Sequence, residues 1–294
     1  VWLLGNPVVS VAMDNEGRFT AAGTRKSTAP TTGSLTLINN TLWTLQWSKT
    51  LNVSTSYDGG YMGTESKSVD VKYNYYNSCV VVAAATDQGL YLYDQGGNLI
   101  WQYYDGYPET IVRISQDGNY IVCASVSGSA VQEGVHYFSH LRDGKPGWDP
   151  ADGVPIWTHY KLDTGGFFWV AISGIGDYVA ISGWWVKPTA YVALHDRTGA
   201  QVWLHTLTKR GYVRVDMPCN GRSVVSVNDD PTDQNGTDLH YFSDMKDGIP
   251  GWDSADGTPV WSYWPGWPNP QNRLHDFYTV AISENGDYVA AGGI

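Results

Sequence analysis

The chain has 294 residues, a formal net charge of −11 and 16% charged residues, with 33 glycines, 14 tryptophans and 20 tyrosines. Its acidic balance and scattered Lys and Arg residues argue against nucleic-acid binding, because phosphate contacts need clustered basic side chains. No apolar run approaches the roughly 18 residues that a membrane-spanning helix needs, and three cysteines are too few for a disulfide framework.

One pattern recurs six times along the chain: a short apolar strand that opens on Val, a tight turn with Gly or Asn, and a second apolar strand. β-Branched and aromatic residues around such a turn predict a β-hairpin, and its recurrence about every 40 to 65 residues predicts a repeat architecture. The opening residues are Val11, Val71, Val112, Val170, Val215 and Val280.

A second predicted hairpin follows each of the first five, and its last strand carries a tryptophan. These residues are Trp47, Trp101, Trp157, Trp203 and Trp261. Four antiparallel strands per repeat predict an all-β fold, a six-bladed β-propeller. Because no Pro- or Ser-rich linker separates the repeats, we expect residues 1–294 to form a single domain.

The two ends of the chain are expected to complete the sixth blade. Residues 1–5 match the Trp-bearing fourth strand, with Trp2 in the place of Trp203, and residues 278–293 form the last hairpin. The last blade would then be closed by N- and C-terminal strands, yet about one strand of it is missing. Either the sequence is an excerpt of a longer chain, or the slot stays open, or a neighbouring molecule fills it by strand addition.

Two kinds of motif resemble known families. Residues 92–101 and 194–203 each hold an Asp, a Gly turn and a final Trp, and they resemble the Asp-x-x-Thr-Gly-x-x-x-Trp repeats of quinoprotein-like propellers. Residues 286–290, Gly-Asp-Tyr-Val-Ala, resemble the hairpins of archaeal surface-layer-associated propellers of the WD-like or YVTN type. The resemblance implies architecture. Quinone dehydrogenases of that family add two further blades and a cofactor site, and no residue here matches that site.

Aromatic residues gather in loops that we expect to share one face of the propeller. Exposed aromatic clusters stack on sugars or anchor protein partners, and the alternative is that the same rings pack between blades. The candidate partner-binding residues are Tyr107, Phe168, Trp184, Trp185, Trp264 and Trp267.

The first strand of each repeat is expected to line the central channel, where four charged residues could converge. A convergent group would hold an anionic ligand, whereas the plainer interpretation is ion pairs between blades. The four residues are Lys72, Arg113, Arg214 and Asp216.

Repeats three and five share an insertion, residues 142–153 and 246–257, that is rich in Asp and Gly. Such loops can wrap a calcium ion, and Asp and Gly are equally the ordinary residues of tight turns. The candidate calcium ligands are Asp143, Asp149, Asp152, Asp247, Asp253 and Asp256. The seven His residues show no metal-ligand spacing, and we assign His136 and His240, in matching third strands, a structural role.

Glycosylation sequons at Asn39, Asn52 and Asn235 fall in predicted turns or loops, as in an extracellular glycoprotein. We therefore expect a secreted or cell-surface propeller that acts as a binding or structural module for protein or glycan partners, with self-assembly included. We expect no resident cofactor other than calcium. A quinoprotein-like oxidoreductase or another propeller enzyme is the alternative, and it rests on fold analogy alone.

Overall fold

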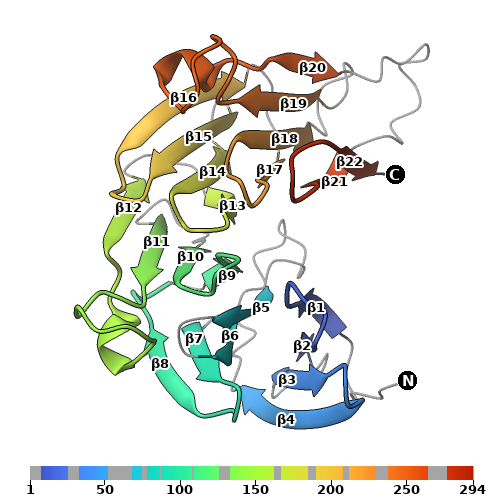
Figure 1. Ribbon diagram of the computed structural model, residues 1–294, viewed down its shortest axis with the longest axis vertical. Helices are drawn as coiled ribbons and strands as arrows, with labels where there is room; N and C mark the ends of the chain where they lie inside the picture. Colours follow the sequence, from blue (N-terminus) through green and yellow to red (C-terminus); the bar gives the residue numbers. More distant parts are fainter. Residues whose placement is uncertain are drawn as a thin grey trace. The chain divides into compact units, whose positions relative to one another are not determined.

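The computed structural model describes residues 8–25, 33–51, 68–74, 78–86, 88–107, 109–125, 133–161, 167–184, 190–207, 212–229, 238–263 and 277–293. These residues form 22 β-strands and two short 3-10 turns (Figure 1). In the part of the chain so described, no helix has the length and apolar character to cross a membrane. The chain divides into two compact units, residues 1–129 with 135–158, and residues 130–134 with 159–294.

The first unit contains three antiparallel sheets of four strands each, with their strands in chain order. Sheet 1 comprises β1 (Val8–Met13), β2 (Phe19–Arg25), β3 (Gly33–Asn39) and β4 (Thr44–Leu51). Sheet 2 comprises β5 (Val69–Asn74), β6 (Cys79–Thr86), β7 (Gly89–Asp94) and β8 (Leu99–Tyr103). Sheet 3 comprises β9 (Glu109–Ile114), β10 (Tyr120–Ser125), β11 (Glu133–Ser139) and β12 (Trp157–Lys161), the last three residues of which belong to the second unit.

The second unit contains two sheets of four strands and one of two strands. Sheet 4 comprises β13 (Phe167–Ile172), β14 (Tyr178–Trp184), β15 (Ala190–Asp196) and β16 (Gln201–Leu207). Sheet 5 comprises β17 (Tyr212–Asp216), β18 (Ser223–Asp229), β19 (Asp238–Ser243) and β20 (Trp261–Tyr263). Sheet 6 comprises β21 (Phe277–Ile282) and β22 (Val289–Gly293).

The six hairpins expected from the sequence are the first two strands of the six sheets. In each, the opening Val pairs with a residue of the second strand, for example Val112 with Cys123 and Val215 with Ser226. The turns between them use a residue with positive φ, such as Gly118 at 73°. The Gly118 N–H donates to the Ser115 carbonyl, 2.9 Å away. The repeat pattern therefore predicted these hairpins, and the structure adds their register.

Apolar side chains fill the space between successive sheets within each unit. Leu90, Leu92, Val112, Ile121 and Phe138 are buried together between sheets 2 and 3. Burying one such side chain contributes about 1.5–3 kcal/mol. The inner strands are apolar on both faces, whereas in β4 only the Trp of Leu45-Gln46-Trp47 is buried, so the Trp-bearing strand is the outer strand of the sheet.

Both insertions end in a 3-10 turn, η1 (Pro150–Gly153) and η2 (Ser254–Gly257). In the first, Trp148 Nε1 donates to the Gly118 carbonyl, 2.7 Å away, and its ring lies 5.9 Å from that of Trp101. A side chain at Gly153 would place its Cβ 2.9 Å from Trp101 Cβ. The insertion therefore packs over the outer Trp of the preceding sheet.

Residues 1–7 lie outside the described part of the chain, and with them Trp2. Three expectations therefore stay predictions: that N- and C-terminal strands close the last blade, that residues 1–294 form a single domain, and that the sequence is an excerpt of a longer chain.

Candidate functional site

Three ionisable side chains converge inside the first unit, between sheets 2 and 3. Asp105 follows β8, Glu109 opens β9 and His136 lies in β11. Their nearest ligand atoms all lie within 4.8 Å of one another. In the described part of the chain, this is the one group of three or more His, Cys, Asp or Glu side chains arranged in this way.

A β-bulge brings Glu109 into this group. Along β9 and β10, Ile111 pairs with Ala124, and the next pair is Glu109 with Ser125, which leaves Thr110 as the extra residue. Bulges bend a strand and re-aim its side chains. The first strands of sheets 1, 4 and 6 have a bulge at the same place, and there the residue in the position of Glu109 is Val8, Phe167 or Phe277. A carboxylate at this position is therefore an exception among the repeats.

The imidazole of His136 is held from both sides. Its Nε2 lies 3.0 Å from Asp105 Oδ2 and 3.7 Å from Glu109 Oε1. Its Nδ1 lies 3.1 Å from Thr158 Oγ1 and 3.3 Å from the Tyr103 hydroxyl. The side chains of His136 and Glu109 are 0% exposed, and that of Asp105 is 7% exposed.

Burial dominates the electrostatics of the site. It raises the pKa of Glu109 well above its usual value, and the nearby Asp105 raises this pKa further, while a hydrogen bond from the Cys123 thiol lowers it. Burial and the Glu109 carboxyl together raise the pKa of Cys123 well above that of a free thiol. In the described part of the chain no Lys or Arg forms an ion pair with either carboxylate. The arrangement can share protons or hold a cation.

The sequence pointed to a structural role for His136 and missed the two carboxylates beside it. The two histidines make matching contacts, as their matching positions suggested. His136 Nδ1 lies 3.1 Å from Thr158 Oγ1, and His240 Nδ1 lies 2.7 Å from Ser262 Oγ, a hydroxyl of the fourth strand in both sheets. The signal that could have found Glu109 is the comparison of repeats in register. A search for short linear motifs does not detect it.

The predicted aromatic face falls largely on residues that the structure does not describe. Trp185, Trp264 and Trp267 lie outside the described residues, and Phe168 and Trp184 lie in β13 and β14. Tyr107 is half-buried, and its backbone N–H donates to Asp105 Oδ1, 3.0 Å away. Tyr107 therefore anchors a member of the buried group, and recognition by the aromatic face stays a prediction.

The four residues expected in the channel are divided between the two units. In the first unit, Lys72 Nζ lies 3.5 Å from Asp70 Oδ1, and Arg113 Nη1 donates to the Val112 carbonyl. In the second, the Arg214 guanidinium lies 4.8 Å from the centre of the Trp169 ring. Asp216 Oδ2 accepts from the Ile282 backbone, 2.9 Å away. The ion pair of Lys72 lies within β5 and does not join two sheets. Ion pairs between blades and an anionic ligand both stay predictions.

The six carboxylates of the insertions are engaged in turns. Asp149 and Asp253 cap the 3-10 turns, and each accepts from the backbone N–H two residues ahead. Asp152 and Asp256 accept from the backbones of Asp149 and Asp253, 3.0 Å away in both loops. Asp143 and Asp247 accept from the Lys145 and Ile249 backbones. Within the described residues neither set of three converges within 4.8 Å, so the geometry is that of Asp turns and calcium stays a prediction.

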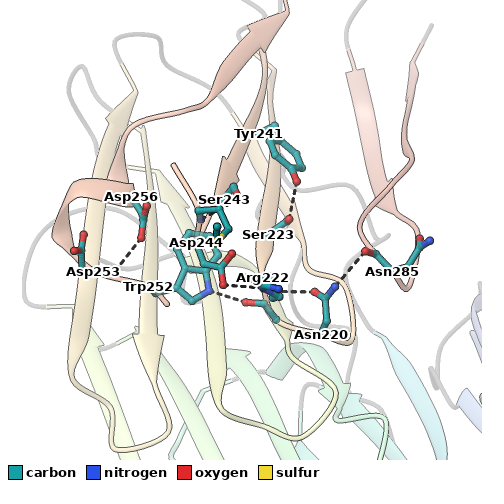
Figure 2. Close-up of polar contacts among 12 residues, drawn as sticks. Asn220, Arg222, Ser223, Tyr241, Ser243, Asp244, Trp252, Asp253, Asp256 and Asn285 are labelled. Carbon is teal, nitrogen blue, oxygen red and sulfur yellow. Dashed lines mark hydrogen bonds and ion pairs between the residues drawn. The ribbon is translucent and has the colours of Figure 1, made fainter. Parts of the chain in front are cut away.

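The second insertion is tied to its neighbours in the same unit (Figure 2). Trp252 Nε1 donates to the Gly221 carbonyl, 2.6 Å away, and Arg222 Nε donates to Asp244 Oδ2, 2.9 Å away. Asn220 Nδ2 donates to the Asn285 carbonyl in the hairpin of sheet 6. The first two contacts hold the insertion to the β17–β18 turn of its own sheet, and the third joins sheet 5 to sheet 6.

The turn between β3 and β4 and the first residues of β4 expose apolar side chains that we name the apolar tip: Leu42, Trp43 and Leu45, which are 66%, 76% and 46% exposed. Trp43 has a φ of 53°, a left-handed conformation that costs a bulky residue about 1–2 kcal/mol. The base of the turn is firmly held, because the side-chain amide of Asn40 donates to the Gly17 carbonyl and to Thr20 Oγ1, each 2.9 Å away.

The repeated sheets and their packing define this chain as a β-propeller, and comparison with solved structures shows the same fold. A chain of a mitotic checkpoint complex matches over 99% of this chain and 76% of its own length, with a TM-score of 0.61 and 14% identity. A chain of hydrazine synthase from Kuenenia stuttgartiensis matches over 100% and 77%, with a TM-score of 0.64 and 13% identity. The β-propeller domain of Cps50 (Swd1) from Myceliophteria thermophila matches over 98% and 80%, with a TM-score of 0.58 and 9% identity.

No protein-family model matches the sequence, and a comparison with curated proteins finds no match. The similar structures include an enzyme and a checkpoint complex, so they share the fold and assign no activity to this chain.

Proposed function

We propose that this propeller is a binding module for a protein partner in an extracellular or cell-surface assembly. The observation that carries the proposal is the apolar tip. Three large apolar side chains are exposed on the β3–β4 turn and at the start of β4, and the most exposed of them, Trp43, has a left-handed backbone conformation. A strained, exposed Trp costs free energy in the isolated chain, and burial against a partner would offset that cost.

The turn is suited to recognition because it is already ordered. Asn40 ties it to the neighbouring hairpin, and Asn39 Oδ1 accepts from the Leu42 backbone, 2.9 Å away. Little conformational entropy would then be lost on binding. A Trp in the centre of an interface commonly accounts for about 2 kcal/mol or more of the binding free energy.

The surface location rests on the sequence. The sequon at Asn39 lies at the end of β3, beside the apolar tip, and the hairpins resemble those of surface-layer-associated propellers. Glycan recognition rests on the aromatic residues Trp185, Trp264 and Trp267, and self-assembly by strand addition rests on the sixth repeat. A propeller enzyme is the alternative function, and it rests on fold analogy alone.

The test compares three forms of the protein as bait in extracts of the native source. The tip variant carries Leu42→Ser, Trp43→Ser and Leu45→Ser. The control carries Ile249→Ser, at a residue that is 63% exposed in the second insertion. We expect one partner to be retained by the native protein and the control and to be lost from the tip variant, with equal melting temperatures.

Direct binding of that partner, purified, to the native protein is then measured by calorimetry. A glycan array probed with the same three forms covers the other class of ligand. Equal retention by the native protein and the tip variant would contradict the proposal.

A further inference from the structure

We propose that Asp105, Glu109 and His136 form a binding site for one divalent transition-metal ion, for which Zn²⁺ is the probe. The inference is independent of the apolar tip and of any partner that the tip binds. It rests on the burial of the three side chains, on the spacing of their ligand atoms and on a comparison with the matching site of sheet 5.

The two buried carboxyl groups have few hydrogen-bond donors: the Tyr107 backbone N–H donates to Asp105 Oδ1, 3.0 Å away, and the Cys123 thiol hydrogen-bonds to Glu109. Both oxygens of Glu109 are buried, and no nitrogen or oxygen donor in the described part of the chain reaches either of them. His136 is the ion-pair partner that the described residues offer to Asp105 and to Glu109. Keeping a charge inside a protein costs several kcal/mol unless it is paired. A divalent cation would neutralise both carboxylates at once.

The spacing suits a single ion. Ligand atoms about 2.1 Å from a tetrahedral Zn²⁺ lie about 3.4 Å from one another. His136 Nε2 lies 3.0 Å from Asp105 Oδ2 and 3.7 Å from Glu109 Oε1, and all three ligand atoms lie within 4.8 Å. Rotamer adjustments of about 1 Å or less would bring them to coordination distance.

The ring of His136 is positioned as metal-binding imidazoles are. Its Nδ1 faces Thr158 Oγ1 at 3.1 Å and the Tyr103 hydroxyl at 3.3 Å, and either hydroxyl can accept an Nδ1–H. A proton on Nδ1 leaves the lone pair of Nε2 directed at the carboxylates. Outer hydrogen bonds of this kind fix the tautomer and the orientation of a histidine ligand.

Sheet 5 shows what the same histidine looks like without the carboxylates. His240 pairs with Ser226 as His136 pairs with Cys123, and its Nδ1 lies 2.7 Å from Ser262 Oγ. The position of Asp105, four residues after the outer Trp, is occupied by the buried Leu207.

The position of Glu109 shows the same change. Glu109 pairs with the residue two beyond Cys123, and Val213 pairs with the residue two beyond Ser226. Val213 is buried and apolar. The repeat therefore folds with apolar residues in both positions, and the two acids are an addition specific to sheet 3.

The donor set selects the class of ion. Imidazole nitrogen favours Zn²⁺, Fe²⁺, Ni²⁺ or Cu²⁺ over Mg²⁺ and Ca²⁺, and carboxylate oxygen is accepted by all of them. Three protein ligands would leave one tetrahedral position for water or another small ligand. The segment from Tyr104 to Tyr107 offers a route of entry, because Tyr104 is exposed and a Cβ at Gly106 would meet no atom within 4 Å.

The experiment uses the whole chain after dialysis against a chelator. Zn²⁺ alone is titrated into the native protein, Glu109→Gln and His240→Gln, with calorimetry for affinity and native mass spectrometry for stoichiometry. We expect one Zn²⁺ per chain in the native protein and in His240→Gln. Glu109→Gln keeps the size of the side chain and should bind at least about tenfold more weakly, as even the loss of an outer-shell contact does.

Circular dichroism and melting establish that each variant is folded. If Glu109→Gln does not fold, Asp105→Asn replaces it with the same expected loss. The absence of Zn²⁺ binding to the native protein would show that the three groups share protons instead, and would overturn the proposal. Equal Zn²⁺ affinity of the native protein and the folded Glu109→Gln or Asp105→Asn variant would overturn it as well. So would a loss of Zn²⁺ affinity in His240→Gln as large as that in Glu109→Gln.

Discussion

The clearest pH-dependent element of this fold is His195, in β15. Its side chain is buried, and its ring lies 5.0 Å from that of His159, in the part of β12 that belongs to the same unit. Burial, and secondly the charge of His159, lower the pKa of His195 from 6.5 to about 4. The folded protein therefore holds this group neutral at pH values at which the unfolded chain would already be charged.

The sign follows from proton linkage. Between pH 6.5 and about 4 the unfolded chain binds more protons at this residue than the folded chain does. The contribution of His195 to the free energy of unfolding is therefore at its maximum above pH 6.5 and falls as the pH is lowered. For these two pKa values, the loss from pH 7.5 to pH 5 is about 2 kcal/mol. That is a substantial fraction of the roughly 5–15 kcal/mol by which proteins are stable.

The perturbation is His195→Phe. Phe fits because Phe138 and Phe242 occupy the same register position in sheets 3 and 5. Urea unfolding at pH 7.5 and pH 5 measures the acid-induced loss in each protein, and the difference between the proteins cancels the other titrating groups. We expect His195→Phe to lose about 2 kcal/mol less than the native protein.

The control is His159→Gln, which removes only the second cause of the lowered pKa. It should retain more than half of the acid-induced loss. If the native protein and His195→Phe lose the same free energy to within about 0.5 kcal/mol, the reasoning about His195 is wrong.

Three further predictions concern the second insertion. Trp252→Phe should lower the free energy of unfolding by about 1–3 kcal/mol in urea melts, because the Gly221 carbonyl loses its donor; an unchanged midpoint would contradict this. Gly257→Ala should lower the free energy of unfolding by about 1–3 kcal/mol, since its Cβ would lie 2.9 Å from that of Trp203. An unchanged free energy would show that the loop shifts to accommodate the methyl group. Asp253→Ala should cost about 1 kcal/mol through loss of the turn cap, equally with calcium and with chelator; a cost seen only with calcium would make Asp253 a ligand.

The sequence predicted the fold well because hairpins are local. The alternation around Val112 and Val215 and the Gly turns that follow them predicted strand and turn within about a dozen residues, and the structure confirms both. The outer strands could be placed because each carries a Trp at a matching position. Trp47, Trp101 and Trp203 are buried, whereas Trp157 is half-buried and Trp261 is exposed. Contacts between sheets come from residues far apart in the chain, and the same patterns do not specify them.

The buried group was missed for that reason. Asp105 and Glu109 lie about 30 residues before His136. The pairing of β9, β10 and β11 brings Glu109 near His136, and the segment after β8 adds Asp105. The bulge that re-aims Glu109 leaves no mark in the alternation of β9. Asp143 and Asp149 were predicted as calcium ligands because they are close together in an Asp- and Gly-rich loop. In the structure each accepts a hydrogen bond from the backbone N–H two residues ahead.

The most direct test of the proposed binding function is the affinity of one purified partner for the native propeller and for the tip variant. Calorimetry at equal salt and temperature should show at least about tenfold weaker binding for the variant, corresponding to about 1.4 kcal/mol or more for the three lost apolar contacts. The Ile249→Ser control should bind like the native protein. Equal dissociation constants for the native protein and the tip variant, with both folded, would contradict the account.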